Sequence, residues 1–247
     1  MRGLINRLSA QFTEERGTPW LFLLLGLCGL AYVLVHIIQI QRYILPAGQF
    51  KIIHVAGAAA LIFLYAAAKA ESMLTRWLHL ALAIVAAGIL WYVFHEHTLL
   101  TTRRSFLPNT TDTIVAAVFL LICLYASIRE WGWVVAAIAV IGLLYGYFGY
   151  LMPEGLLYHG GITLKRLIGY TSIPFFSGLL GGLAELSAGT IFPFMLLAAG
   201  LRATGCVDFI MALAYRVGGQ TRAGPAQIAV ISSGMMGMVS GSSVANV

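Results

Sequence analysis

Charged residues are scarce in this sequence. They make up 10% of its 247 residues, whereas 60% of the residues are hydrophobic. A soluble domain of this length cannot bury so much apolar surface, so the composition excludes a soluble globular protein and indicates an integral membrane protein. Acidic residues are fewer than basic ones, which gives a net charge of +6. Because the basic residues lie between apolar runs, membrane lipids explain them better than a nucleic acid partner does.

Cysteine is also rare, and the N-terminal residues do not have the pattern expected of a cleavable leader. Cys28, Cys123 and Cys206 are isolated from one another and lie in or near apolar runs. This spacing excludes a disulfide framework and predicts small packed side chains without a metal. The N-terminal "MRGLINRLSAQFTEERGTPW" is too polar for a signal-peptide core, and no small-residue cleavage pattern follows the first apolar run. That run is therefore predicted to remain as a membrane span.

Long apolar runs dominate the rest of the chain. A helix needs about 20 apolar residues to cross a bilayer, because lipid offers the backbone no hydrogen-bond partner. Spans are predicted at residues 20–40, 52–68, 77–95, 112–128, 131–152 and 173–201, with a tight turn or a bent junction at Arg129 and Glu130. The predicted fold class is an all-α integral membrane protein with about six transmembrane helices, interfacial helices and the start of a re-entrant hairpin.

The lysine and arginine residues favour a cytoplasmic N-terminus. This orientation places the larger group of basic residues inside and the smaller group outside. The inner group is Arg2, Arg7, Arg16, Lys69, Arg76, Arg129, Arg202, Arg216 and Arg222, and the outer group is Arg42, Lys51, Arg103, Arg104, Lys165 and Arg166.

Two stretches are predicted to lie at the membrane surface. Residues 153–172 form a basic, glycine-broken connector. Residues 206–219 place Phe209, Ile210, Leu213 and Val217 at helical spacing, which predicts an amphipathic helix on the cytoplasmic face. From residue 178 onward glycine becomes dense and Pro193 interrupts the sixth run, a pattern typical of broken or closely packed helices at a transport site.

Glu185 is an acidic residue in the middle of this last apolar stretch. A carboxylate in lipid is costly, so Glu185 is a candidate for a proton or ion path that faces a cavity. The alternative is that "GGLAELSAG" lies nearer the interface, where water hydrates the carboxylate. The sequence leaves both interpretations open.

Histidines gather near the predicted outer ends of the first three spans: His36, His54, His95 and His97. Histidines at similar depth on antiparallel helices can ligate haem, so a membrane cytochrome-like redox subunit is the alternative function. The simpler interpretation is that these side chains face head groups or water.

The closing stretch combines a short apolar helix with a polar end. "GPAQIAVISSGMMGMV" is too short to cross a bilayer, and it runs into "SGSSVANV". Backbone and side-chain oxygens at membrane depth are tolerated where they line a cavity or bind a cation. The candidate cavity-lining or cation-binding residues are therefore Ser240, Gly241, Ser242, Ser243 and Asn246. An ordinary polar turn between two helices is the alternative.

From about Trp131 to Val247 the sequence resembles the large membrane domain of a tripartite ATP-independent periplasmic (TRAP) transporter. "RAGPAQIAVISSGMMGMVSGSSVANV" carries the most specific part of the likeness, which is to fused permeases of the TAXI branch. Residues 1–128 resemble the four-helix small-subunit region in number and position of spans only. The predicted domains are thus 1–128 and 129–247.

The resemblance implies an elevator-type secondary transporter of a bacterial or archaeal cytoplasmic (inner) membrane, not an enzyme. It implies no cofactor, Na⁺ as the coupling ion, and a small organic solute, such as an organic acid, delivered by an extracytoplasmic binding protein. It also assigns the serine-rich tip of the first re-entrant hairpin to cation and substrate binding. Such transporters carry a second, inverted hairpin, so the chain is expected to be truncated within the first hairpin and inactive by itself.

Overall fold

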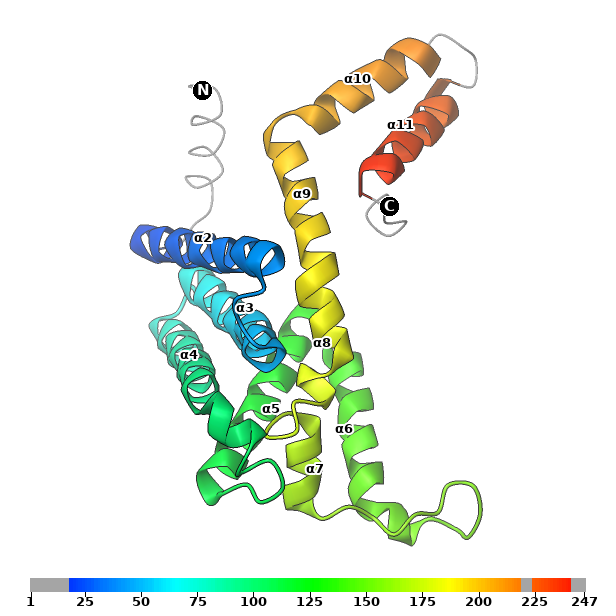
Figure 1. Cartoon of the computed structure of the whole chain (residues 1–247). Coiled ribbons are helices and arrows are strands. Elements are labelled where there is room, and N and C mark those ends of the chain that lie inside the picture. Colours follow the sequence, from blue (N-terminus) through cyan, green and yellow to red (C-terminus); the bar gives the residue numbers. More distant parts are fainter. Residues whose placement is uncertain (1–17, 219–223, 241–247) are drawn as a thin grey trace. The chain divides into compact units, whose positions relative to one another are not determined.

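The computed structural model describes residues 18–218 and 224–240, and within these residues every regular element is helical (Figure 1). The α-helices are α2 (Pro19–Arg42), α3 (Ala47–Lys69), α4 (Met73–Thr101), α5 (Thr110–Trp131), α6 (Trp133–Phe148), α7 (Leu164–Thr171), α8 (Gly182–Leu186), α9 (Phe192–Ala203), α10 (Cys206–Gly218) and α11 (Gly224–Ser240). Short 3₁₀ turns cover Gly149–Leu151 and Gly178–Leu180, and a π-helical turn covers Ser187–Ile191.

Among the described residues, six helical segments are long and apolar enough to cross a membrane, which confirms the predicted class. They are Pro19–Arg42, Ala47–Lys69, Met73–Thr101, Thr110–Trp131, Trp133–Leu151 and Gly178–Ala203. Because successive spans cross in opposite directions, α2, α4 and α6 begin at one membrane face, where α3 and α5 end. We call this the N-terminal face, and the other the opposite face.

Local sequence signals set several helix ends. Pro19 occupies the first turn of α2, where its missing N–H costs nothing. The Ser72 hydroxyl caps α4 by accepting the Thr75 N–H at 3.1 Å. Asn109 and Asp112 form a reciprocal capping box at the start of α5.

Two predicted boundaries were wrong. The junction between the fourth and fifth spans lies at Gly132, not at Arg129 and Glu130, because Gly132 adopts a φ of +81° that ends α5. The sixth span begins at Gly178 rather than Ile173. Residues 173–177 form a turn instead, and Gly178 (φ +55°) lies so close to the Thr171 carbonyl that a Cβ atom would collide with it.

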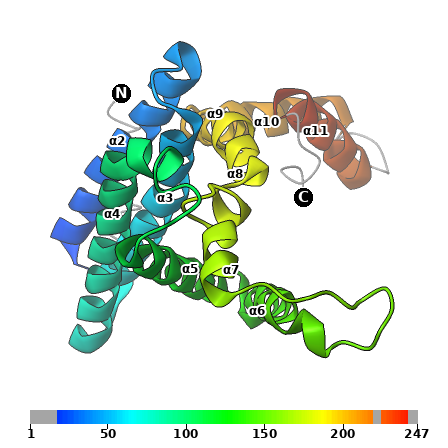
Figure 2. The ribbon, with the colours of Figure 1, turned by 60° about the horizontal axis from the view of Figure 1, so that its bottom comes forward.

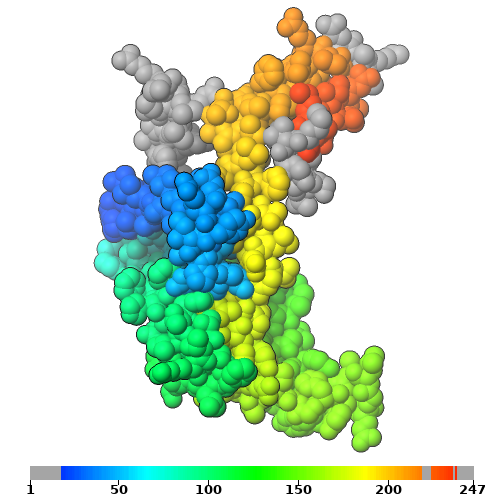
Figure 3. Space-filling view, viewed as in Figure 1, coloured from blue at the N-terminus to red at the C-terminus, as the bar shows by residue number. Residues whose placement is uncertain are grey.

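The chain divides into two compact units, and residues 18–186 are the described part of the larger one. α3 is its central helix and contacts α2, α4, α5 and α8. Alanines at 56, 59, 66, 67 and 68 are buried on α3, and such small side chains let helix backbones approach closely in a membrane. α7 lies between α5 and α6 (Figure 2). Figure 3 shows that the segment between α6 and α7 projects from the rest of this unit.

The smaller unit contains residues 187–218 and 224–240 among the described residues. α10 and α11 pack side by side, and Gly218 makes this possible because a Cβ atom there would lie 3.1 Å from the Gln227 Cβ. α10 is a helix as predicted. Ile210, Ala214 and Gly218 are buried, whereas the larger Phe209 and Val217 are exposed.

The sixth span departs from regular α-helix where the glycine-rich sequence and Pro193 predicted an interruption. The π-helical turn at Ser187–Ile191 comes directly before α9, whose second residue is Pro193. Proline has no N–H to donate and its ring crowds the preceding turn, so regular α-helical bonding cannot continue through it. π-helical turns inside helices are frequent at functional sites.

Candidate functional site

The predicted ion and substrate residues lie at the end of α11 and beyond it. Ser240 is the last residue of this helix, and Gly241, Ser242, Ser243 and Asn246 lie outside the described residues. α11 contains 17 residues, about 25 Å at 1.5 Å per residue, which is shorter than a bilayer core. The predicted short helix before the serine-rich sequence is confirmed. The role of the five residues stays a prediction.

Glu185 has a basic partner that the sequence did not reveal. Its carboxylate lies 3.9 Å from the Nζ atom of Lys51, at the start of α3. The Lys51 side chain is 11% exposed and that of Glu185 is 61% exposed. A partly exposed pair at this distance contributes little to stability, but it offsets the charge of both groups. A role for Glu185 in an ion or proton path stays a prediction.

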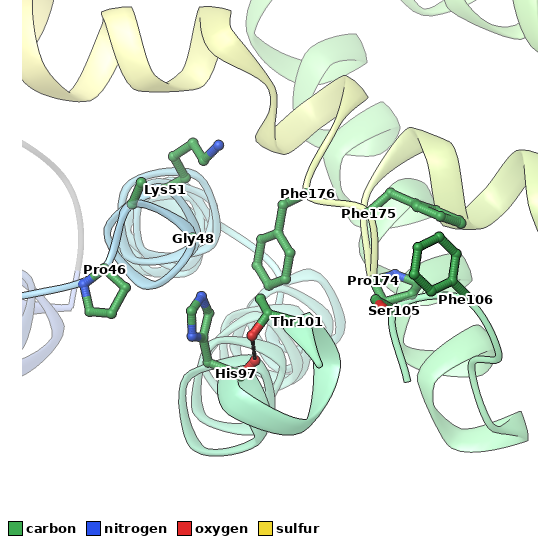
Figure 4. A pocket seen from close by; sticks show the side chains of 11 residues that line it. Pro46, Gly48, Lys51, His97, Thr101, Ser105, Phe106, Pro174, Phe175 and Phe176 are labelled. Carbon is green, nitrogen blue, oxygen red and sulfur yellow. Dashed lines mark hydrogen bonds between the residues drawn. The ribbon is translucent and has the colours of Figure 1, made fainter. Parts of the chain in front are cut away.

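A pocket of about 410 Å³ opens beside Lys51 at the opposite face of the same unit. The start of α3, the end of α4, the following loop and the turn before α8 line it. Figure 4 shows the His97 and Phe176 rings beside Gly48. A Cβ atom on Gly48 would lie 2.5 Å from His97 Nε2, so this glycine allows the histidine to pack against α3. The lining combines a lysine with aromatic rings, which suits small amphipathic molecules.

The four predicted outer histidines do not converge on one point. His36 Nε2 and His54 Nδ1 lie 3.0 Å apart, and the Tyr32 hydroxyl lies 2.9 Å from His54 Nδ1. An iron ion between two imidazoles needs about 4 Å between the nitrogens, two metal–nitrogen bonds of about 2 Å. His95 stacks on Trp91, and His97 packs against Phe176. Within the described ranges, no group of three or more His, Cys, Asp or Glu side chains could hold a metal ion.

A network centred on Asp112 joins α4 and α5 at the opposite face. Asp112 is fully buried, and its carboxylate accepts hydrogen bonds from Tyr92 at 2.6 Å, Arg104 at 3.0 Å and the Asn109 N–H at 2.9 Å. Arg104 also pairs with Glu96. Desolvation lowers the pKa of Arg104, but the Asp112 charge and the bonds to Tyr92 and Glu96 together raise that pKa above its usual value. The cluster is satisfied within itself, which is typical of a structural network.

The sequence did not indicate that Lys51, Asp112 and Arg104 belong to buried or half-buried polar clusters. The capping-box spacing of Asn109 and Asp112 was the one signal that could have marked Asp112. Lys51 and Glu185 are far apart in the sequence, so only the packing of α3 against α8 brings them together.

The spans, the broken sixth span and the short α11 define a multi-pass α-helical membrane protein. Residues 117–247, more than half of the chain, match the family described as "Tripartite ATP-independent periplasmic transporter, DctM component", and the chain belongs to this family. The match begins inside α5 and includes every later helix. No curated protein and no solved structure matches the chain.

Proposed function

We propose that the chain is the permease component of a TRAP transporter that imports an organic acid or similar small solute. An extracytoplasmic binding protein delivers the solute, a Na⁺ gradient drives its entry, and an elevator movement carries it across. The family match over residues 117–247 is the observation that supports this proposal most strongly. The TAXI branch and the assignment of residues 1–128 to a small-subunit-like region are part of the same proposal.

The C-terminal sequence supports Na⁺ as the coupling ion. α11 ends at Ser240, and Gly241, Ser242, Ser243 and Asn246 follow it. Hard cations prefer several oxygen ligands, and these residues supply hydroxyl, amide and backbone oxygens. Half-helices that end at membrane depth expose such oxygens to ions and substrates.

Uptake by intact cells of the native host tests the proposal. Cells are given a panel of radiolabelled small carboxylic acids with and without external Na⁺, and a strain lacking the gene is compared. At least one acid is expected to accumulate in a Na⁺-dependent manner only where the gene is present. Equal accumulation in both strains across the panel would count against the proposal.

The proposed orientation places the N-terminal face in the cytoplasm. Leu107, in the exposed loop between α4 and α5, and Glu71, between α3 and α4, then lie on opposite sides of the membrane. In a variant without native cysteines, Leu107→Cys is expected to react with a membrane-impermeant maleimide in intact cells. Glu71→Cys is expected to react only after permeabilisation. The reverse pattern of labelling would show the opposite orientation.

Substitution of Glu185 distinguishes Na⁺ coupling from H⁺ coupling. Under Na⁺ coupling, Glu185→Gln is expected to leave Na⁺-driven uptake intact and to change the free energy of unfolding by less than about 1 kcal/mol, because the pair with Lys51 is long and partly exposed. Glu154→Gln, a change of the same kind on an exposed loop, is the control. Loss of uptake in a folded Glu185→Gln protein would instead favour H⁺ coupling through this carboxylate.

A further inference from the structure

The pocket beside Lys51 carries one full positive charge and no negative charge in its lining. We call it the Lys51 pocket. Lys51 is the only lysine or arginine among its lining residues, and none of these residues is an aspartate or a glutamate. Its volume of about 410 Å³ falls within the range of about 300–1,000 Å³ that is typical of small-molecule sites. The pocket therefore has the size and the charge to accept a small anion.

Lys51 is a buried cation whose hydrogen-bond donors are unmet. Only 9% of the residue is exposed. Within the described part of the chain, the partner of its Nζ atom is the Glu185 carboxylate at 3.9 Å, which is too long for a hydrogen bond. Nζ is not sealed off, because the fully enclosed unpaired side-chain nitrogens among the described residues are those of Arg76 and His79. A buried charge without hydrogen bonds costs free energy, so an acceptor brought by a bound molecule stabilises this ammonium group.

His97 adds a second donor on the same side of α3. Gly48 and Lys51 are three residues apart, so they are neighbours on one side of that helix. A Cβ atom on Gly48 would lie 2.5 Å from His97 Nε2, which places the histidine ring against this side. Among the described residues, the ring makes no hydrogen bond and packs edge-on against the Phe176 ring, with centroids 5.3 Å apart. A neutral histidine ring carries one N–H, so Lys51 and His97 both offer donors to the pocket.

The rest of the pocket lining is apolar apart from two hydroxyls. The Thr101 hydroxyl donates to the His97 carbonyl at 2.8 Å, and the Ser105 hydroxyl donates to the Thr102 carbonyl at 2.9 Å, so neither hydrogen is left for a ligand. Figure 4 shows two phenylalanine rings on one side of the pocket and a proline and the lysine on the other, namely Phe106, Phe175, Pro46 and Lys51. Such walls favour a ligand with an apolar body beside its charged group.

We propose that the Lys51 pocket binds a monocarboxylate with an apolar body, such as an aromatic or medium-chain acid. A single buried ammonium matches one carboxylate charge, and a hydrogen bond between two charged groups is stronger than one between neutral groups. The carboxylate accepts from Lys51 and His97, and the apolar body contacts the phenylalanine rings. The proposal concerns the 18–186 unit, and the expected binding requires neither Na⁺ nor transport.

The Glu185 carboxylate gives this proposal a test of sign. It lies 3.9 Å from Lys51 Nζ, but its side chain is 61% exposed and it is not part of the pocket lining. A bound carboxylate and Glu185 carry like charges near the same ammonium group, so they repel each other. Removing the Glu185 charge is therefore expected to strengthen binding, whereas removing the Lys51 charge is expected to weaken it. A ligand held by apolar contacts alone would respond to neither change.

Binding to the purified protein in nanodiscs tests the pocket. The protein is titrated with radiolabelled phenylbutyrate in Na⁺-free buffer, and empty nanodiscs measure partition into lipid. Saturable binding of one molecule per chain is expected. The neutral amide of phenylbutyrate and acetate are each expected to displace it at least about tenfold more weakly than phenylbutyrate itself, because each lacks either the charge or the apolar body.

Three outcomes of this titration would overturn the proposal. One is the absence of saturable binding above that of empty nanodiscs. Displacement by the amide as strongly as by phenylbutyrate would show an apolar cavity that does not recognise the carboxylate. Displacement by acetate as strongly as by phenylbutyrate would show a simple anion site that does not recognise the apolar body.

Single substitutions locate the bound carboxylate. Lys51→Gln is expected to weaken phenylbutyrate binding about tenfold, and Glu185→Gln is expected to strengthen it about threefold. Lys165→Gln removes a lysine charge from an exposed position on α7 outside the pocket lining, and it is expected to leave binding unchanged. Thermal unfolding without ligand shows whether each variant is folded. If Lys51→Gln does not fold, Glu185→Gln still decides, because it changes an exposed side chain. Unchanged binding in a folded Lys51→Gln protein, or binding that is not strengthened in the Glu185→Gln protein, would contradict the proposal.

Discussion

Replacing Asp112 by Asn is expected to lower the free energy of unfolding by about 3 kcal/mol. The substitution keeps the size of the side chain but removes a charge that is fully buried and bonded to Tyr92, Arg104 and the Asn109 N–H. Arg104 would keep only Glu96 as an acidic partner in this network. The measurement is thermal or chemical unfolding of the purified protein in detergent.

Two further variants show whether the loss comes from the Asp112 network. Glu154→Gln makes the same change in charge on the exposed segment after α6, and it is expected to alter stability by less than about 0.5 kcal/mol. Arg104→Met combined with Asp112→Asn is expected to cost less than the sum of the two single substitutions, because the first change already removes the interaction. Equal stability of the Asp112→Asn and Glu154→Gln proteins would show that the network contributes nothing.

Replacing Ser242 or Asn246 by Ala is expected to reduce Na⁺-driven uptake at least about tenfold. Each substitution removes one oxygen proposed to bind the cation or the solute, and a bond to a charged group contributes about 1.5–3 kcal/mol. Both residues belong to the "SGSSVANV" sequence that follows α11. Initial uptake rates are measured in host cells that carry the substitution at the native gene, at several Na⁺ concentrations.

The matched control for these variants is Ser233→Ala. Ser233 is an exposed serine on α11 itself, in the same sequence stretch, but it lies seven residues before the end of the helix. Uptake by this variant is expected to equal that of the unsubstituted protein. Normal Na⁺-dependent uptake in both the Ser242→Ala and Asn246→Ala cells would remove the serine-rich tip from the proposed site.

The membrane spans were predictable because their cause is local. A helix in lipid must satisfy its own backbone and present apolar side chains, so each span leaves a continuous run in the sequence. Five runs correspond to α2, α3, α4, α5 and α6 with small shifts at their ends. The prediction of where the sixth span starts was wrong because that start depends on a contact between two segments. Gly178 must pass the Thr171 carbonyl, and hydropathy carries no information about that approach.

α10 likewise combines a feature that the sequence predicts with one that depends on contacts between helices. Its helical periodicity was visible in the sequence, and the helix forms over Cys206–Gly218. The sequence did not indicate which residues of this helix contact another helix. The structure buries Ile210, Ala214 and Gly218, and the absence of a side chain at Gly218 allows a close contact with α11. In a membrane protein, large apolar residues can face lipid, so a large apolar side chain is not necessarily buried within the protein.

The sequence by itself determined the class of protein, its spans, and its likeness to the TRAP permeases, because these follow from composition and from a continuous motif. It also marked Glu185 and the residues from Ser240 to Asn246. Only the tertiary structure joined Lys51 to Glu185, Asp112 to Arg104, and His79 to Arg129. Each of these pairs links two different helices or a helix and a loop. Their geometry depends on how those segments pack, and no local pattern of residues encodes it.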